Sequence, residues 1–227
     1  MLLESRLSSV KEKVRQACDR SGRQSDSVTL IAVSKRKTVA EIQEAFGFQQ
    51  KHFAENYLQE AEEKRVLLID QPIIWHFIGR LQSKKIKNIV NRFEYLHAVD
   101  SVAHFKEIDR RAQEPQKVFL QVNLAQEESK GGVLESELDS VFAEAQALPN
   151  IRLEGLMAMP PLTEKPNESR PYFAQLRELA QAWQPRLDSQ HSLKHLSMGT
   201  SSDYEVAIEE GATMVRVGTE IFGERFN

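Results

Sequence analysis

Cysteine and long apolar runs are scarce in this chain, and each scarcity excludes a class of protein. Cys18 is the only cysteine among 227 residues, so an intramolecular disulfide is impossible and nothing favours an oxidising compartment. No run approaches the roughly 20 apolar residues that a membrane-spanning helix needs. The first residues, from Met1 to Arg6, contain no apolar segment typical of a signal peptide. We therefore expect a soluble, cytoplasmic protein that does not associate with membranes.

The chain also lacks an excess of positive charge and a recognisable metal-ligand pattern. Its formal net charge is −3, which argues against a general nucleic-acid-binding protein. The six histidines include no i, i+4 pair on a predicted helix and have no cysteine partner, so we expect no metal site. No G-x-G-x-x-G follows the first apolar run, which disfavours a dinucleotide-binding open sheet. These absences do not exclude a binding site for another kind of small molecule.

Eight apolar runs alternate with helical patterns along the chain. The runs lie near 28–34, 51–54, 73–78, 94–99, 117–124, 151–159, 193–198 and 213–217, with helices near 38–48, 56–67, 82–92, 101–113, 133–147, 168–183 and 202–210. An earlier helical pattern starts at Leu3 and ends before Ser21. Strand–helix alternation implies right-handed βαβ units and a parallel sheet. We predict one α/β domain, residues 1–227, folded as a single (β/α)8 TIM-type barrel with an extra N-terminal helix; an open doubly wound sheet is the alternative.

Capping residues mark several predicted helix starts. Thr38 and Ser202 are each followed by glutamate three residues later, which is capping-box spacing, and Ser101 offers an N-cap. The segment 160–167 follows the sixth strand and is predicted to be either a surface connection or a lid over the barrel mouth.

Lys35 ends the first apolar run, whose aliphatic residues are typical of a strand buried on both faces. An ammonium ion is costly to keep charged at such a position, so the pKa of the lysine can fall toward neutrality. A neutral amine that faces a pocket is what Schiff-base chemistry with an aldehyde requires. The alternative is that Lys35 only marks the strand end and extends into solvent.

The last two strands lead into segments suited to phosphate. Residues 197–203 precede a helix whose free N–H groups favour an anion, although they could equally be a plain helix cap. Gly218 permits close backbone approach, and its amide with the Thr219 amide and hydroxyl could hold phosphate oxygens. A phosphate site between the loops after strands seven and eight recurs in barrels. Opposite a strand-one lysine, it favours one ligand that carries both an aldehyde and a phosphate.

Arg216 is predicted to lie inside the mouth, between the lysine and the phosphate site. A buried guanidinium needs an acceptor because it cannot lose its proton. A pyridine nitrogen would serve, and it would stay unprotonated, which makes the ring a weaker electron sink. The alternative is an ion pair between Arg216 and a glutamate across the barrel.

Several ordered segments together resemble one known family. They are AVSK at 32–35, ENY at 55–57, WHFIG at 75–79 with LQS at 81–83, VDS at 99–101, SKG at 129–131, SMG at 197–199, and RVGT at 216–219 with IFG at 221–223. This order is similar to that of the pyridoxal 5′-phosphate homeostasis proteins, whose barrel resembles the N-terminal domain of alanine racemase. The resemblance covers nearly the whole chain. Ala54 and Lys85 depart from the family pattern, without removing an assigned cofactor contact.

The resemblance implies pyridoxal 5′-phosphate as the cofactor, held by a Schiff base to Lys35. It implies that Arg216 faces the pyridine nitrogen, and by position Asn56, His76 and Met157 would line the ring pocket. The residues that it places around the phosphate are Ser197, Ser201, Gly218 and Thr219.

The resemblance also implies a carrier or buffer in intracellular vitamin B6 homeostasis, with effects on amino-acid metabolism, rather than a catalyst. A racemase needs an acid–base group on each face of the substrate α-carbon. In alanine racemase the second is a tyrosine from an extra domain, which we do not expect here, and Tyr57 and Tyr204 are the nearest replacements. A pyridoxal-phosphate-dependent racemase or decarboxylase is the alternative. A Schiff-base aldolase acting on a sugar phosphate is a third hypothesis, with Asp100 as its strand-end carboxylate.

Pyridoxal-phosphate-dependent apoenzymes are possible recipients of the cofactor, and we expect a monomer. A basic run, Arg80, Lys84, Lys85 and Lys87, begins a predicted helix and is interpreted as a solvated face, a docking patch or a secondary anion site. Lys130 is predicted to lie in a turn.

Overall fold

The computed structural model describes residues 2–127 and 131–224, so Lys130 lies outside the described residues. Eight parallel strands close into a barrel in sequence order, and β8 pairs with β1. The predicted barrel is therefore confirmed. The strands are β1 (Thr29–Val33), β2 (His52–Glu55), β3 (Ile74–Phe77), β4 (Tyr95–Val99), β5 (Gln116–Gln121), β6 (Ile151–Met157), β7 (His195–Thr200) and β8 (Met214–Val217).

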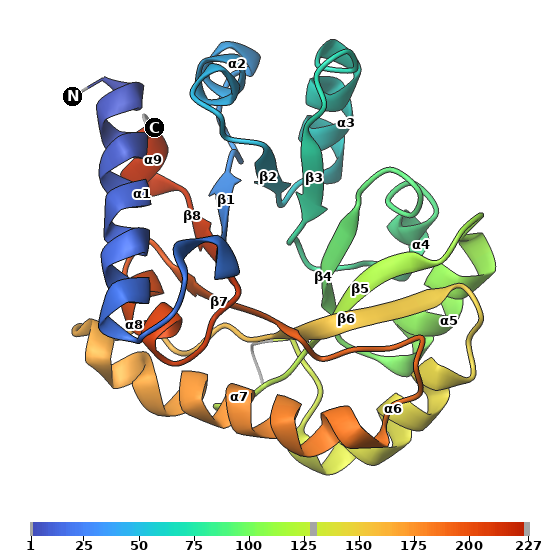
Figure 1. Ribbon diagram of the computed structural model, residues 1–227. Coiled ribbons are helices and arrows are strands. Elements are labelled where there is room, and N and C mark those ends of the chain that lie inside the picture. Colours follow the sequence, from blue (N-terminus) through green and yellow to red (C-terminus); the bar gives the residue numbers. More distant parts are fainter. Residues whose placement is uncertain (1, 128–130, 225–227) are drawn as a thin grey trace.

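Helices follow the strands and cover the outside of the barrel, as Figure 1 shows. The predicted N-terminal helix is present and precedes β1. The α-helices are α1 (Leu3–Arg20), α2 (Val39–Gly47), α3 (Leu58–Leu67), α4 (Ser83–Ile86), α5 (Val102–Arg111), α6 (Leu138–Gln146), α7 (Arg170–Trp183), α8 (Tyr204–Glu209) and α9 (Thr219–Phe222).

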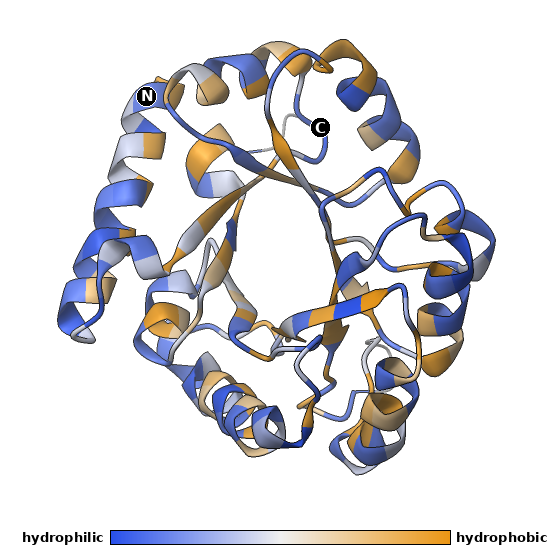
Figure 2. Cartoon of the chain, turned by 45° about the vertical axis from the view of Figure 1, so that its right-hand side comes forward, coloured by the Kyte–Doolittle hydropathy of each residue, from blue (hydrophilic) through white to orange (hydrophobic). Residues whose placement is uncertain are grey.

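The core divides into two apolar clusters. The larger one lies between the helices and the outer faces of the strands. The smaller one lies inside the barrel and includes Ile31, Phe119, Met157 and Met214. Figure 2 shows hydrophobic residues on both the strands and the surrounding helices. The barrel interior is thus filled with side chains, as in other eight-stranded barrels.

Some local predictions are confirmed and others are wrong. Thr38 forms the predicted capping box with Glu41, and the Ser101 side chain caps α5. The capping box predicted at Ser202 is absent, because Asp203 is the N-cap of α8 and its carboxylate accepts from the Thr200 N–H at 2.7 Å. The predicted helix over 82–92 is α-helical only over the four residues of α4. Helix α9 was not predicted.

Strand β7 runs two residues further than predicted, to Thr200. Ser197 therefore lies in the middle of a strand rather than at its end, and it is fully buried. The extension follows from pairing, since Thr200 is in register with Arg216 of β8.

Helix α1 joins the start of the chain to its end. Arg6 Nε donates to the Ile221 carbonyl at 2.8 Å, and Lys13 pairs with Glu220 at 3.0 Å. Arg23, just after α1, donates to the Ile208 carbonyl at 2.8 Å. Figure 1 shows α1 beside α8 and α9, with both termini on that side. The N-terminal helix thus supports the elements that follow β7 and β8.

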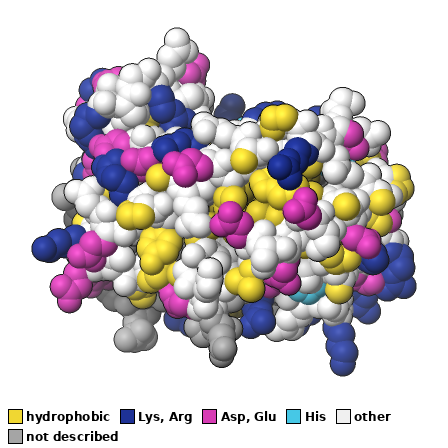
Figure 3. Space-filling view, turned by 90° about the horizontal axis from the view of Figure 1, so that it is seen from below, with side chains coloured by type: hydrophobic (Ala, Val, Ile, Leu, Met, Phe, Trp, Pro, Cys, Tyr) yellow, Lys and Arg dark blue, Asp and Glu magenta, His cyan; other side chains and the backbone are white. Residues whose placement is uncertain are grey.

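Within the described residues, no helix combines the length and apolarity needed to cross a membrane. Figure 3 shows one face of the molecule, on which acidic and basic side chains are interspersed among apolar and uncharged ones.

Candidate functional site

Lys35 directly follows β1, and the residues on both sides of it are tied to other strands and helices. The Ser34 N–H donates to the Ala54 carbonyl at 3.0 Å. The Arg36 N–H donates to the Glu60 carboxylate at 2.5 Å, and Arg36 adopts a left-handed backbone with φ of 59°. The chain therefore turns at Lys35 in a fixed direction, with the lysine itself partly buried.

A buried ion pair lies behind this turn. Lys64 Nζ lies 2.7 Å from Glu55 Oε1 and 2.6 Å from Glu60 Oε1, and it donates to the Ser34 carbonyl at 2.7 Å. Ser34 Oγ donates to Glu55 Oε1, also at 2.7 Å. Burial raises the pKa of Glu55, and Lys64 opposes that rise. This cluster, Ser34, Glu55, Glu60 and Lys64, holds the backbone around Lys35.

Arg216 lies inside the barrel beneath the mouth and is only 4% exposed. Its Nη1 donates to Ser197 Oγ at 2.6 Å and its Nη2 to the Ala158 carbonyl at 3.1 Å. Burial lowers its pKa to about 10, so the group remains a cation at neutral pH. Both acceptors are neutral, so the alternative of an ion pair with a glutamate is wrong for the described residues. Two of its five N–H groups make these bonds, and the remainder can serve another acceptor.

The loops after β7 and β8 meet as predicted. The Gly218 N–H donates to Ser201 Oγ at 3.2 Å. A Cβ at Gly218 would lie 3.3 Å from the Val33 carbonyl, so the glycine lets this loop pass close to the end of β1. Thr219 begins α9 directly after it. Ser201, Gly218 and Thr219 thus lie together near the strand that leads to Lys35.

The segment after β6 forms a wall of the mouth. Met159, Leu162 and Thr163 border one cavity together with Thr200 and Arg216. Met159 and Leu162 are exposed. The segment therefore borders the mouth, and the lid and the surface connection both stay predictions for residues 160–167.

Asn56, His76 and Met157 occupy different depths. Asn56 follows β2, and its Oδ1 is buried without a hydrogen-bond partner. A Cβ at Gly79 would overlap the Asn56 carbonyl, so the loop after β3 packs directly on it. Met157 and His76 are buried inside the barrel, at 1% and 0% exposure. Asn56, just after β2, and Met157, the last residue of β6, therefore lie at strand exits, whereas His76 lies within β3.

A row of histidines crosses the barrel interior below Arg216. His52 Nδ1 lies 3.0 Å from His76 Nε2, and His76 Nδ1 lies 2.9 Å from His97 Nε2. His97 Nδ1 lies 2.8 Å from Ser197 Oγ, which is the acceptor of Arg216. Burial lowers the pKa of all three imidazoles. His52 and His97 were not predicted as site residues. The signal that could have indicated them is that His52, His76 and His97 stand on three neighbouring strands.

Two of the three alternative acid–base groups, Tyr204 and Asp100, contact other side chains. Tyr204 is buried and its hydroxyl donates to Glu220 at 2.9 Å, and burial together with Glu220 raises its pKa. Tyr57 is half-exposed. Asp100 lies 2.7 Å from His104 Nδ1, on the helix that follows it.

The basic run divides between two surface hollows. Arg80 borders one with Asp100 and His104, and Lys84 and Lys87 border another against α5. All four residues of the run, including Lys85, are exposed. This placement agrees with a solvated face, and the docking and anion hypotheses remain predictions.

Comparison with known proteins places the chain clearly. A family profile described as "Alanine racemase, N-terminal domain" matches residues 6–225. A pyridoxal phosphate homeostasis protein from Aquifex aeolicus is 43% identical over 97% of both chains. Another from Pseudomonas aeruginosa is 41% identical over 96% of this chain and 94% of that one.

Solved structures agree with the sequence matches. PipY of Synechococcus elongatus PCC7942, solved without PLP, is 38% identical, with a TM-score of 0.88 over 98% of this chain and all of that one. PipY solved with PLP bound has a TM-score of 0.85 over the same shares. Alanine racemase from Corynebacterium glutamicum is 18% identical with a TM-score of 0.71, and the match covers 96% of this chain and 62% of that chain, so it shows the shared fold alone.

Proposed function

Because the chain belongs to the pyridoxal phosphate homeostasis protein family, we propose that it binds pyridoxal 5′-phosphate at the barrel mouth. We further propose that it acts as a carrier or buffer in vitamin B6 homeostasis, and so affects amino-acid metabolism. In this proposal, residues 1–227 form one cofactor-binding domain. The protein acts as a monomer in the cytoplasm and transfers the cofactor to apoenzymes. The observation that carries the proposal is the buried cation Arg216, which lies between the end of β1 and the two loops that contain Ser201 and Gly218.

The residues present suit this cofactor. Its aldehyde would form the Schiff base with Lys35, and its ring is an electron sink that an arginine partner keeps weak. Arg216 already uses neutral acceptors for two N–H groups and can donate another to a ring nitrogen. Ser201 and Thr219 would offer hydroxyl and backbone N–H groups to the phosphate. Gly218, whose N–H donates to Ser201 Oγ, would let the loop approach the phosphate closely. Ser197 supports Arg216 from below and reaches the cofactor only through it.

A carrier agrees with these residues better than a racemase does. A second acid–base group on the face of the ring opposite Lys35 would have to titrate near neutral pH. Tyr204 does not meet that requirement, since its raised pKa keeps the phenol protonated and its hydroxyl is bonded to Glu220. Curated relatives of this chain are named homeostasis proteins. An amino-acid racemase of the same fold is the second candidate.

The visible absorption spectrum tests cofactor binding. We expect the chain, mixed with pyridoxal 5′-phosphate, to show a Schiff-base band that borohydride removes and that Lys35→Ala lacks. Lys37→Ala is the matched control, because Lys37 follows in the same turn but its ammonium contacts the Phe222 carbonyl at 3.3 Å. A chain that stays colourless, or a Lys35→Ala variant that keeps the reducible band, would contradict the proposal.

Transfer and turnover separate the carrier from the racemase. The loaded chain should activate an apo-aminotransferase faster than Lys35→Ala incubated with the same total cofactor. Incubation with L-alanine in deuterated water should yield no D-alanine. Lysine-dependent formation of D-alanine would instead establish the racemase.

A further inference from the structure

An unbroken hydrogen-bonded row runs from Arg216 to the N-terminal end of the barrel. It passes through Ser197, His97 and His76 to His52, with successive distances of 2.6, 2.8, 2.9 and 3.0 Å. His52 is the first residue of β2 and is partly exposed, whereas His76 and His97 have no exposed surface. The row therefore connects solvent at one end of the barrel with the arginine beneath the mouth at the other.

The arginine dictates which way the hydrogen bonds point. Arg216 only donates, so Ser197 Oγ accepts from it. Among the described residues, Ser197 Oγ has only one other partner, His97 Nδ1. The hydroxyl proton of Ser197 therefore has His97 Nδ1 as its acceptor, which places the proton of neutral His97 on Nε2. His97 Nε2–H donates to His76 Nδ1, and His76 Nε2–H donates to His52 Nδ1. With all hydrogen bonds donated in this one direction, from Arg216 toward His52, each residue of the row has a partner, and each imidazole is neutral and protonated on Nε2.

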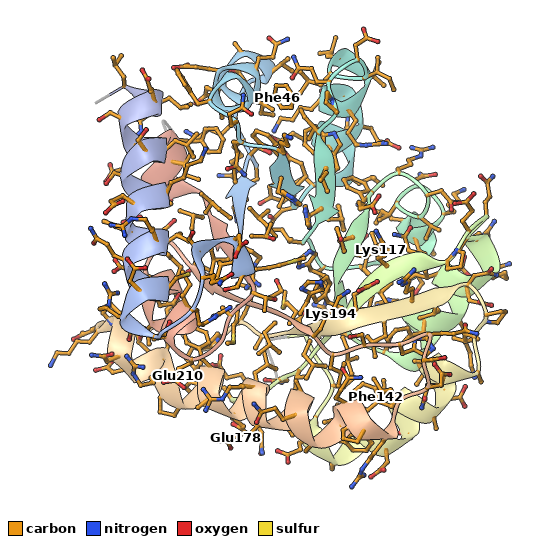
Figure 4. All side chains as sticks on the ribbon, viewed as in Figure 1. Phe46, Lys117, Phe142, Glu178, Lys194 and Glu210 are labelled. Carbon is orange, nitrogen blue, oxygen red and sulfur yellow. The ribbon has the colours of Figure 1, made fainter. Side chains whose placement is uncertain are left out.

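The surroundings keep the imidazoles neutral. His76 stacks on Tyr95 with ring centroids 4.8 Å apart, and His97 stacks on Phe119 at 4.3 Å. Burial lowers the pKa of both rings, and the remaining influences come from neighbouring basic groups, which act in the same direction. These groups are Lys51, Lys117, His195 and Arg216, together with the other histidines of the row. Lys117 of β5 and Lys194 before β7 are labelled in Figure 4. The nearest acidic groups, Glu94 and Glu154, face Lys117, Arg152 and Lys194.

We propose that His52, His76 and His97 are positioning residues, which hold Ser197 as an acceptor and thereby fix the guanidinium of Arg216 toward the mouth. The proposal rests on the proposed function for the statement that Arg216 faces the cofactor. The direction of the hydrogen bonds along the row does not depend on the cofactor and can be tested in the chain alone. Removing the hydrogen bond at His52 should therefore weaken cofactor binding, although His52 lies at the end of the barrel opposite the mouth.

Nitrogen NMR of the chain labelled with ¹⁵N-histidine tests the polarity without cofactor. At pH 7 we expect His76 and His97 to be neutral and protonated on Nε2. His195, whose Nδ1 lies 3.3 Å from Thr213 Oγ1 outside the row, is an internal reference in the same spectrum. A charged ring, or a proton on Nδ1 of His97, would overturn the proposal whether or not the chain binds the cofactor.

Three variants test the coupling to the arginine. His52→Leu removes the acceptor of His76, whereas His52→Gln supplies a carbonyl oxygen in its place. The dissociation constant of pyridoxal 5′-phosphate should rise about 3- to 10-fold in His52→Leu, the range expected for one lost hydrogen bond, and should stay within about 2-fold of wild type in His52→Gln. His195→Leu, also at the start of a strand, is the matched control and should bind normally. Equal affinities for the two His52 variants, or equal losses in His52→Leu and His195→Leu, would overturn the coupling.

Discussion

Glu55 and Lys64 form an ion pair 2.7 Å long in the interior of the protein, with their side chains 0% and 6% exposed. Ser34 bonds to both partners, through its hydroxyl to Glu55 and through its carbonyl to Lys64. The residue immediately before Lys35 is thus fixed by two buried charges. The same pair therefore supports the barrel and, in the proposed function, the residue that would attach the cofactor.

Lys64→Met should destabilise the protein by about 3–5 kcal/mol, because it leaves the Glu55 carboxylate buried without its cation. Urea unfolding at pH 7 measures the loss. The double variant Glu55→Gln/Lys64→Met is the control, since it removes the charge together with its partner and should recover most of the stability. A double variant as unstable as the single one would show that packing of the lysine stem, rather than the charge, is what matters.

Gly79→Ala should lower stability by about 1–3 kcal/mol, the usual cost of forcing extra volume into a packed site. The added Cβ would overlap the Asn56 carbonyl, so the loop after β2 has to shift. Gly47→Ala is the matched control, because a Cβ there meets nothing within 4 Å, and it should stabilise α2 by about 0.5–1 kcal/mol. Thermal unfolding compares the two, and equal effects would contradict the close approach at Asn56.

Arg36→Val should cost about 1–2 kcal/mol, because Arg36 has φ of 59° and a β-branched residue fits the left-handed region poorly. Arg36→Gly should be tolerated, since glycine adopts this backbone without strain. The free energy of unfolding of both variants decides the matter, and a valine as stable as the glycine would show that the turn relaxes.

Stability should fall as the pH drops from 6.5 toward 5. Burial lowers the pKa of His52, His76 and His97 from the ordinary 6.5, so the unfolded chain binds protons in this window that the folded chain does not. Stability is therefore complete above pH 6.5 and is lost below it, by up to about 1.4 kcal/mol per pH unit for each such histidine. Urea midpoints across this range measure the slope. His76→Phe should reduce that slope by about one proton; an unchanged slope would mean that His76 is charged in the folded state.

The sequence was sufficient to predict the barrel and most of the mouth. Parallel strands buried on both faces are nearly continuous apolar runs, so most of the eight could be located from hydrophobicity. The short β2 gives the weakest such signal, because His52 and Glu55 dilute its apolar residues. Lys35, Ser201, Gly218 and Arg216 follow because strand ends meet at one face of a barrel. The structure places them in or just after β1, β7 and β8, because their place depends on the order of elements, which the sequence shows directly, and their contact with a cofactor stays a prediction.

The row below Arg216 could not be predicted in the same way. His52, His76 and His97 belong to three different strands, and their contact depends on the stagger between strands, which no local pattern records. The end of β7 was misplaced for a related reason. Thr200 is held in the strand by pairing with Arg216, a residue 16 positions later, while its own neighbours, Ser201 and Ser202, are typical of a loop.

The contacts between α1 and the last two helices have a consequence for synthesis on the ribosome. The helix made first has its partners, Ile221 and Glu220, among the residues made last. The buried face of α1, which includes Leu7, Val10 and Val14, therefore cannot pack against α8 and α9 until some 200 further residues have been synthesised. Contacts so distant along the chain form slowly, and exposed apolar surface invites association with other chains in the interval. The nascent barrel is most vulnerable to aggregation through its first helix, before its last strand can close.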